Sequence, residues 1–309
     1  MKILKPKFWD KQSLLSFLLY PLSLIYLLFL GLKKIISSKS VFSVPIICVG
    51  NIYVGGTGKT PLSILITKEL LKIKKKPVII RKFYRSHSDE YKMIKNERID
   101  MITNKNRENA IKEALKSKFD TIILDDGLQD YKISPNCKII CFNQKQKIGN
   151  GFTLPAGPLR ESLKSIKNSN LIMINGDKDV EFEKKLFNYN AKVKIYYSVY
   201  KPINADKFKN KKILALAGIG NPENFFNLLR KNNLSVFEKS VFPDHYEFSK
   251  SELSKIILKA KRNNFCVVTT EKDYFRIKDY NLTEIEYLKT ELVIENKQQF
   301  LKDIMKIYD

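Results

Sequence analysis

The hydrophobic pattern begins with one long apolar run near the N-terminus. From Leu14 to Leu32 no side chain carries a charge, and lysines flank both ends. As a helix, this run would be about 28 Å long, close to the thickness of the hydrocarbon core of a bilayer. Pro21 lies inside the run and should kink or break the helix. The pattern predicts an N-terminal membrane-associated segment over residues 1–40.

Beyond this run, short apolar segments alternate with segments of helical spacing. The alternation predicts a mostly parallel sheet flanked by helices, so the fold class is α/β. Strands are predicted at 44–50, 77–81, 121–126, 138–142 and 171–175. Helices are predicted at 62–74, 107–118 and 159–167.

The same alternation restarts after about residue 200. Strands are predicted at 213–217 and 265–269, with helices at 221–231 and 249–262. A restart of this kind indicates a second, smaller α/β domain. We therefore expect a core domain over 41–200 and a smaller C-terminal domain over 201–309.

The clearest chemical motif follows the first predicted strand. Residues 49–61 read VGNIYVGGTGKTP, a glycine-rich turn between a strand and a helix, although Tyr53 stands where the strict P-loop pattern has glycine. Such a loop directs backbone N–H groups and a helix N-terminus at phosphate oxygens. Lys59 should reach the β- and γ-phosphates of ATP, and the Thr60 hydroxyl should reach Mg²⁺. The predicted nucleotide-binding residues are Val54, Gly55, Gly56, Thr57, Gly58, Lys59 and Thr60.

A pair of carboxylates ends another apolar strand. Residues 122–127 read IILDDG, which is typical of a Walker B strand in a P-loop NTPase-type fold. In parallel sheets the carboxyl ends of neighbouring strands meet at the ligand-binding edge. Asp125 and Asp126 are therefore predicted to hold Mg²⁺, directly or through water. The alternative is a solvated Asp-Gly turn.

The base of a kinase reaction is less clearly marked. Phosphoryl transfer needs a group that positions and deprotonates the acceptor hydroxyl. His245 lies in the predicted second domain, and Asp89 and Glu90 lie in the predicted loop after the second strand. A lone histidine is more often a structural hydrogen-bonding group than a catalyst, and an aspartate such as Asp89 is likewise more often a surface turn residue. The residues alone leave the base open.

Charge and cysteine content add two limits. The chain has 56 Lys and Arg against 32 Asp and Glu, a net charge of +24. This excess permits nucleic acid, anionic lipid or a phosphorylated substrate as a partner, and a general drift toward lysine would also produce it. Four cysteines form no CxxC pair and only two histidines are present, so no zinc site is expected.

The motifs together resemble one family, the lipid A 4'-kinases (tetraacyldisaccharide 4'-kinases). The similarity extends from about residue 8 to about residue 277, and LPAGPLRE with FPDHY is its most selective part. The resemblance implies transfer of the γ-phosphate of ATP, with Mg²⁺, to the 4'-hydroxyl of a tetraacylated glucosamine disaccharide 1-phosphate. The segments, in family order, are VGNIYVGGTGKTP, ILDDGLQD, LPAGPLRE, LAGIGNPENFF, FPDHYEF and TTEKD.

Membrane association follows from the same resemblance. The acyl chains of such a substrate lie in the inner membrane of a Gram-negative bacterium, and nucleotide binding belongs on its cytoplasmic face. The flanking lysines give no orientation, because both ends of the apolar run are positive. A single span, a helix embedded in one leaflet and a buried core helix remain possible. We favour embedding, because the phosphate-binding loop follows the run closely.

The resemblance also implies roles for residues outside the phosphate-binding loop. Asp89 matches the proposed base, and Glu90 is its neighbour and a further metal candidate. His245 matches the histidine that would orient that base or share its proton. Arg160 and Glu161 match an Arg-Glu pair expected near substrate or phosphate.

Three departures from the family pattern qualify these roles. Asp130 stands where the family usually has histidine. Residues 80–85 lack the glycines of the family's SRGYGR-like stretch. The segment from there to Asp89 is shortened, which puts the register of Asp89 in question.

Two other functions fit parts of the sequence. A membrane-bound regulatory ATPase of the deviant Walker A type also carries a GGxGKT loop, but with lysine where this chain has Val54. A nucleic-acid-dependent ATPase would suit the net charge, but its helicase-type motifs are not evident.

Overall fold

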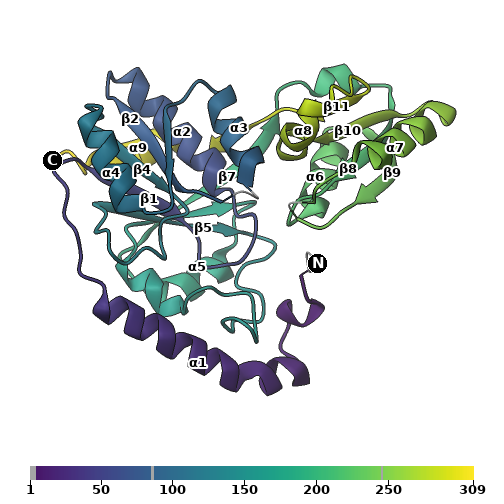
Figure 1. The fold of residues 1–309 in the computed structure, drawn as a ribbon. Helices are drawn as coiled ribbons and strands as arrows, with labels where there is room; N and C mark the ends of the chain where they lie inside the picture. The colour runs from purple at the N-terminus through teal and green to yellow at the C-terminus, as the bar shows by residue number, and fades with distance from the viewer. Residues whose placement is uncertain (1–4, 85–86, 245) are drawn as a thin grey trace. The chain divides into compact units, whose positions relative to one another are not determined.

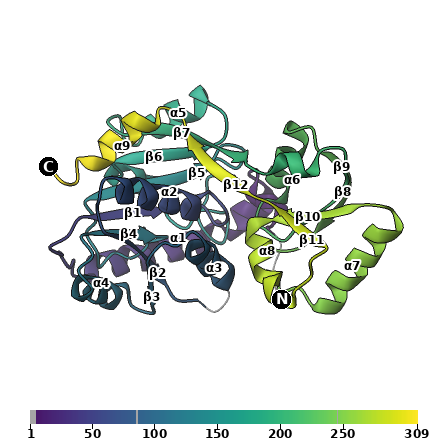
Figure 2. The same ribbon diagram turned by 90° about the horizontal axis from the view of Figure 1, so that it is seen from above.

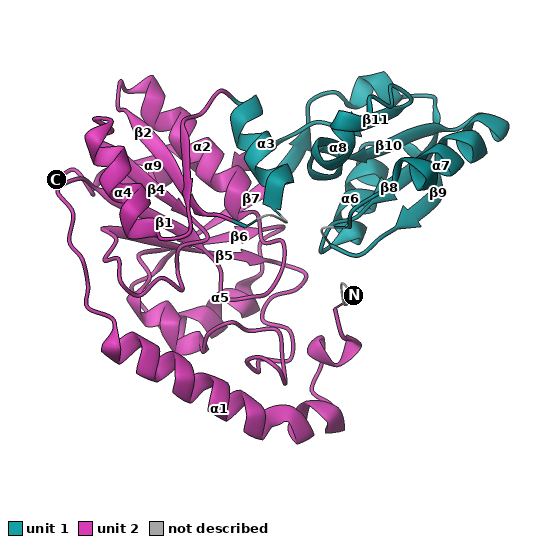
Figure 3. Cartoon of the chain, in the orientation of Figure 1, with its two compact units in different colours: residues 1–4, 84–97, 200–292 teal, residues 5–83, 98–199, 293–309 magenta. Residues whose placement is uncertain are grey.

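The structure is a computed structural model that describes residues 5–84, 87–244 and 246–309. These residues form two compact units (Figure 3). The larger unit contains residues 5–83, 98–199 and 293–309, and the smaller unit contains 84–97 and 200–292. The chain therefore passes between the units several times, whereas the sequence pattern indicated consecutive segments. Residues 84–97 belong to the smaller unit, far in sequence from its main part at 200–292. Residues 293–309 belong to the larger unit, far in sequence from its other segments.

The larger unit is built on an eight-stranded sheet in the described part of the chain, in the order β12-β7-β6-β5-β1-β4-β2-β3. Figure 2 shows this order from β7 to β3. Neighbouring strands from β3 to β7 run parallel, with Val49 of β1 opposite Asp125 of β4. The strands are β1 (Ile46–Gly50), β2 (Pro77–Lys82), β3 (Met101–Asn104), β4 (Thr121–Asp125), β5 (Cys137–Asn143), β6 (Leu171–Asn175), β7 (Lys194–Pro202) and β12 (Thr290–Ile294).

The central strands are apolar on both faces because helices cover the sheet. β1 and β4 are buried at every position. Ile46, Val78 and Ile122 pack with Ala110 and Ile111 of α4 in one hydrophobic cluster. Continuous apolar strands of this type are characteristic of parallel sheets covered on both sides. The helices of this unit are α1 (Leu14–Ile36), α2 (Lys59–Lys72), α4 (Arg107–Lys116), α5 (Val180–Phe187) and α9 (Lys297–Met305).

The smaller unit has a four-stranded parallel sheet in the order β11-β10-β8-β9. Phe226 of α6 and Leu253 of α7 belong to two separate clusters that include residues of β8. Its strands are β8 (Lys212–Ala217), β9 (Ser235–Val241), β10 (Cys266–Thr270) and β11 (Ile285–Leu288). Its helices are α3 (Ser88–Asn96), α6 (Pro222–Lys231), α7 (Lys250–Arg262) and α8 (Glu271–Ile277).

Helix α1 has the reverse of a core pattern. Its only buried residues are Ser16 and Ser23, while Leu18 and Leu28 are 68% and 67% exposed. A buried core helix would show the opposite distribution. By length and composition α1 is the one helix among the described residues that could cross a membrane. Figure 1 shows it along the outside of the larger unit.

Several local expectations need correction. α1 continues through Pro21, so of the two effects expected of this proline, a kink or a break, the break is wrong; proline removes only one bond from a long hydrogen-bond ladder. The helix predicted at 159–167 is instead a loop followed by a 3₁₀ helix at Leu163–Asn168. Asp89 and Glu90 lie in the first turn of α3 rather than in a loop. Acidic residues suit that position because the helix dipole is positive at its N-terminus.

Candidate functional site

The predicted phosphate-binding loop joins β1 to α2 in the larger unit. Gly55 and Gly58 have φ values of +116° and +86°, a region that glycine enters without steric cost. Asn51 stabilises the loop, because its side-chain amide donates to the Thr57 hydroxyl at 2.9 Å and to the Gly55 carbonyl at 3.1 Å. The turn places Lys59 and Thr60 at the start of α2.

Thr60 and Asp125 meet at the carboxyl edge of the sheet. The Thr60 hydroxyl donates to the Asp125 carboxylate at 2.9 Å, and both side chains are buried. The contact arises because β1 and β4 are parallel neighbours, so the segments that follow them converge. Arg81 of β2 donates to the Thr60 hydroxyl at 2.9 Å and forms an ion pair with Asp125.

Asp126 forms a second, distinct group of contacts. It follows β4 with φ +59°, a left-handed conformation that turns it away from the strand direction. Its carboxylate lies 3.8 Å from the Lys59 ammonium and 2.6 Å from the Arg160 guanidinium. Burial alone would raise the pKa of Asp126, but the Lys59 and Arg160 charges outweigh it and hold the pKa well below its ordinary value. Asp126 is therefore an anion at neutral pH.

The LPAGPLRE segment connects this group to α1. The Val54 N–H donates to the Pro158 carbonyl at 2.9 Å, and the Arg160 N–H donates to the Ile52 carbonyl at 2.7 Å. On its other side, Ser23 of α1 donates to the Thr153 carbonyl at 2.8 Å. The segment is thus fixed between the phosphate-binding loop and the apolar helix.

Glu161 and Asp130 are two further acidic residues of the larger unit, and each has a polar partner. Glu161 accepts a hydrogen bond from Gln129 at 2.8 Å, and burial raises the pKa of its carboxyl group. Asp130, at the position where the related family usually has histidine, pairs with Arg107 at 3.5 Å. Arg107 also donates to the Asp126 carbonyl at 2.6 Å. Asp130 therefore supports the carboxylate pair through an arginine.

Asp89 and Glu90 belong to the smaller unit. Asp89 is fully buried, and Arg276 of α8 donates to its carboxylate through Nε at 2.8 Å and approaches it through Nη2 at 2.6 Å. Lys272 lies 3.3 Å from Glu90 and 3.6 Å from Asp244. Burial would lower the pKa of Lys272, but these carboxylates outweigh it and raise the pKa, so Lys272 is charged.

The predicted partner of Asp89, His245, lies outside the described residues. The predicted P-loop and carboxylate residues come together in the larger unit, whereas Asp89 and Glu90 lie in the other unit. Sequence reasoning missed Arg81, Arg107 and Arg276 as functional candidates. Arg81 had a signal, because it falls in the segment that resembles the family's SRGYGR stretch. Nothing in the local sequence distinguished Arg107 or Arg276.

The residues present suit magnesium rather than a softer metal. Among the described residues no group of three or more His, Cys, Asp and Glu side chains could hold a metal ion. Mg²⁺ typically takes one or two protein oxygens and completes its shell with water and nucleotide phosphates. The Thr60 hydroxyl and the Asp125 carboxylate, 2.9 Å apart, provide such a pair of oxygens.

A parallel sheet with a glycine-rich loop after its central strand, and paired aspartates after the next strand, defines a P-loop protein of the phosphotransferase type. The model of the family described as tetraacyldisaccharide-1-P 4'-kinase matches residues 15–98 and 89–309. The chain belongs to this family of kinases, as the sequence motifs predicted.

Individual relatives agree with this assignment. The chain is 40% identical over 315 residues to the tetraacyldisaccharide 4'-kinase of Pelagibacter ubique, covering 99% of both chains. It is 33% identical over 324 residues to that of Rickettsia bellii, again covering 99% of both. The fold is similar to a crystal structure of LpxK from Aquifex aeolicus in complex with ATP, with a TM-score of 0.72 and 23% identity over 96% of this chain. The predicted α/β P-loop fold is confirmed.

Proposed function

We propose that this chain transfers the γ-phosphate of ATP to the 4'-hydroxyl of a tetraacyldisaccharide 1-phosphate at the cytoplasmic face of the inner membrane. The observation that carries the proposal is the contact group of Lys59, Thr60, Asp125, Asp126 and Arg160 around the start of α2. The membership of the chain in a kinase family supports the reaction type.

Within this proposal each residue has a defined task. The loop N–H groups and Lys59 bind the phosphates of ATP and offset charge on the transferring group. Thr60 and Asp125 would hold Mg²⁺, with Asp126 completing the acidic pair and Glu90 as a further candidate. Bound Mg²⁺ supplies Lewis-acid stabilisation of the phosphate oxygens. Arg160 is expected beside a phosphate, because it already faces Lys59 across Asp126.

The acceptor hydroxyl needs a base, and Asp89 is our candidate, with His245 as its partner. Arg276 orients the Asp89 carboxylate and keeps it within an ionic network of the smaller unit. The proposal requires that Asp89 and Lys59, which belong to different units, act on one substrate.

The position of the acceptor lipid follows from α1. Its exposed leucines are suited to hydrocarbon, while Ser23 and Tyr26 contact residues 153–160, which include most of the LPAGPLRE segment. A helix embedded in one leaflet would hold the larger unit at the surface where the sugar of the substrate lies. Exposure of leucines on nearly the whole helix also suits a single span.

The decisive experiment uses labelled ATP and the disaccharide 1-phosphate lipid in detergent micelles. The wild type should form labelled bisphosphorylated lipid, and Lys59→Ala should lose several orders of magnitude in rate. Lys72→Ala, at the other end of α2, is the control and should retain normal turnover. ATP hydrolysis without a phosphorylated lipid would contradict the proposal and favour a regulatory ATPase.

A second variant separates the roles of the two units. Asp89→Ala should lower kcat far more than it changes the KM for ATP, because a base acts in the transition state. A large rise in KM with normal kcat would instead make Asp89 a binding residue.

A further inference from the structure

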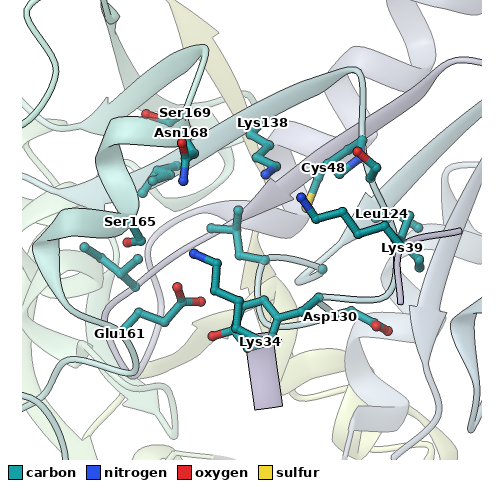
Figure 4. Close-up of a pocket in the computed structure, with 18 residues that line it drawn as sticks. Lys34, Lys39, Cys48, Leu124, Asp130, Lys138, Glu161, Ser165, Asn168 and Ser169 are labelled. Atoms are coloured by element: carbon teal, nitrogen blue, oxygen red, sulfur yellow. The ribbon is translucent and has the colours of Figure 1, made fainter. Parts of the chain in front are cut away.

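A cavity of 240 Å³ lies in the larger unit (Figure 4), and its lining includes Leu124, the residue before the paired aspartates. Gly127 and Leu128, which follow Asp126 directly, form part of its wall. The other walls come from the end of α1, the segment after it, β5 and the 3₁₀ helix after Glu161. The cavity is smaller than the roughly 300–1,000 Å³ typical of sites for whole drug-sized ligands. Its size therefore suits a headgroup rather than a complete lipid.

Three lysines converge on this cavity from different elements. Lys34 comes from α1, Lys39 from the segment that follows, and Lys138 from β5, and Figure 4 shows their ammonium groups directed toward the same space. Within the described ranges, no carboxylate lies within ion-pair distance of any of the three. Lys138 is half-buried, so its charge is not fully solvated.

Each acidic side chain that lines the cavity has a partner other than the three lysines, although the charge of Glu161 also acts on Lys34 and Lys138. Asp130 pairs with Arg107 at 3.5 Å, and Glu161 accepts from Gln129 at 2.8 Å. Burial, followed by the charges of Lys39 and Lys34, lowers the pKa of Lys138. A bound anion would stabilise the charged form of Lys138 against burial and the neighbouring positive charges, so the three lysines suit a negatively charged group.

The location of the cavity indicates the kind of anion. Lys34 lies in the last turn of α1, directly after the exposed apolar run. If that run lies in hydrocarbon, its terminal lysines lie at the level of the lipid headgroups. Lysine binds phosphate as a compact point charge with three donors.

We propose that this cavity binds the phosphate group of a membrane lipid. Two lipids could supply it: the 1-phosphate of the acceptor itself, in which case the inference rests on the proposed function, or an anionic phospholipid of the surrounding bilayer. In either case the site is separate from the ATP phosphates and fixes the protein, or its substrate, at the membrane surface.

The test compares two triple variants that lose the same charge. Lys34→Gln, Lys39→Gln and Lys138→Gln remove the cavity lysines together, whereas Lys11→Gln, Lys33→Gln and Lys132→Gln remove exposed lysines that do not line the cavity. The single Lys39→Gln variant, in an exposed segment, serves if the cavity triple fails to fold.

The first assay measures the KM for the acceptor lipid with and without its 1-phosphate in neutral detergent. If the cavity holds the substrate phosphate, the cavity variant should show at least a tenfold higher KM for the phosphorylated lipid only. The second assay measures binding to phosphatidylcholine vesicles with and without phosphatidic acid. If the cavity holds a bilayer phospholipid, the cavity variant should lose the preference for phosphatidic acid while its KM in detergent stays unchanged.

Equal behaviour of the two triple variants in both assays would overturn the proposal, because the lysines would then act only as diffuse surface charge. Competition by inorganic phosphate in the vesicle assay, present in wild type and absent in the cavity variant, would support a discrete phosphate site. If the wild type phosphorylates no lipid at all, the proposed function fails, while the vesicle assay still decides whether the cavity binds lipid phosphate.

Discussion

At the residue scale, buried charges of opposite sign hold the chemically active side chains in both units. In the smaller unit Asp89 is fully buried against Arg276, which also donates to the Gly218 carbonyl and to Asp273, each at 2.6 Å. Removing one partner of a buried ion pair leaves a poorly compensated charge, which costs more than removing both. The Asp89 network should therefore be energetically coupled.

This coupling can be measured by a double-mutant cycle. Arg276→Met should lower the free energy of unfolding by about 3–5 kcal/mol, because the Asp89 carboxylate stays buried with a weaker set of partners. Adding Asp89→Asn to Arg276→Met should recover part of that loss. Urea unfolding of the two single variants and the double variant gives the coupling energy. Strict additivity of the two effects would show that the pair is not coupled.

A second residue-scale prediction concerns Asp303 in α9, which accepts hydrogen bonds from Lys194 and Tyr196 at 2.5 Å each. Burial alone would raise its pKa, but these hydrogen bonds and that from Lys306 outweigh it and lower the pKa of Asp303 to about 2. A lowered pKa in the folded state gives stability that is complete above the unfolded value near 4 and disappears as the pH falls through about 2.

Asp303→Asn should therefore destabilise the protein by about 1.5–3 kcal/mol at pH 7. The difference from wild type should shrink as the pH falls from 4 to 2. Asp100→Asn, an exposed position in the same unit, is the control and should change stability very little at any pH. A pH-independent difference for Asp303→Asn would contradict the ionic origin of the effect.

At the element scale, α1 is attached to the larger unit by its polar side chains and exposes its apolar ones. Ser23 both donates to Thr153 and accepts from the Ala156 N–H at 3.1 Å, and Tyr26 donates to the Arg160 carbonyl at 2.9 Å. Arg160 accepts from Tyr26 through its carbonyl and pairs with Asp126 through its guanidinium. One short segment therefore links α1 to the residues around the phosphate-binding loop.

The exposed face of α1 gives an element-scale prediction. Leu18→Gln, Leu28→Gln and Phe29→Gln change side chains that are 67–68% exposed, so the fold should be retained. Each replacement should weaken binding to neutral vesicles by about tenfold or more, since each side chain loses its transfer into hydrocarbon. Vesicle flotation measures this. Leu71→Gln on α2, 46% exposed, is the matched control; an equal loss for that variant would argue against insertion of α1.

At the scale of the whole molecule, the net charge of +24 adds a long-range term to membrane binding. Positive surface charge concentrates the protein at anionic bilayers, and salt screens this attraction within roughly 10 Å at 0.1 M. The hydrophobic contribution of α1 should depend much less on salt.

Binding to vesicles that contain phosphatidylglycerol should therefore fall steeply as potassium chloride increases, whereas binding to phosphatidylcholine vesicles should change little. Co-sedimentation over a salt series separates the two contributions. Salt-independent binding to the anionic vesicles would mean that the excess charge has no part in membrane association.

The whole molecule also shows how far sequence reasoning reached. The turn that leads into α2 was predictable because Gly55 to Thr60 are consecutive, and phosphate binding by these residues stays a prediction. Helix α3 was missed because it is short and its polar residues resemble a loop, and the local sequence gives no sign that Asp89 is buried in contact with Arg276 of α8. The segment 159–167 was predicted as a helix because its spacing is helical, but the Arg160 N–H donates to the Ile52 carbonyl of the neighbouring loop instead of to a helical partner.

The sequence by itself determined the P-loop, the carboxylate pair, the apolar helix and the family, because each depends on a short run of residues. Only the tertiary structure decided which distant side chains join them: Arg81 and Arg107 at the aspartates, Arg276 at Asp89, and the three lysines around one cavity. The physical reason is that a single arginine or lysine carries no local signature. Its partner is chosen by the strand order and helix packing that bring remote segments together.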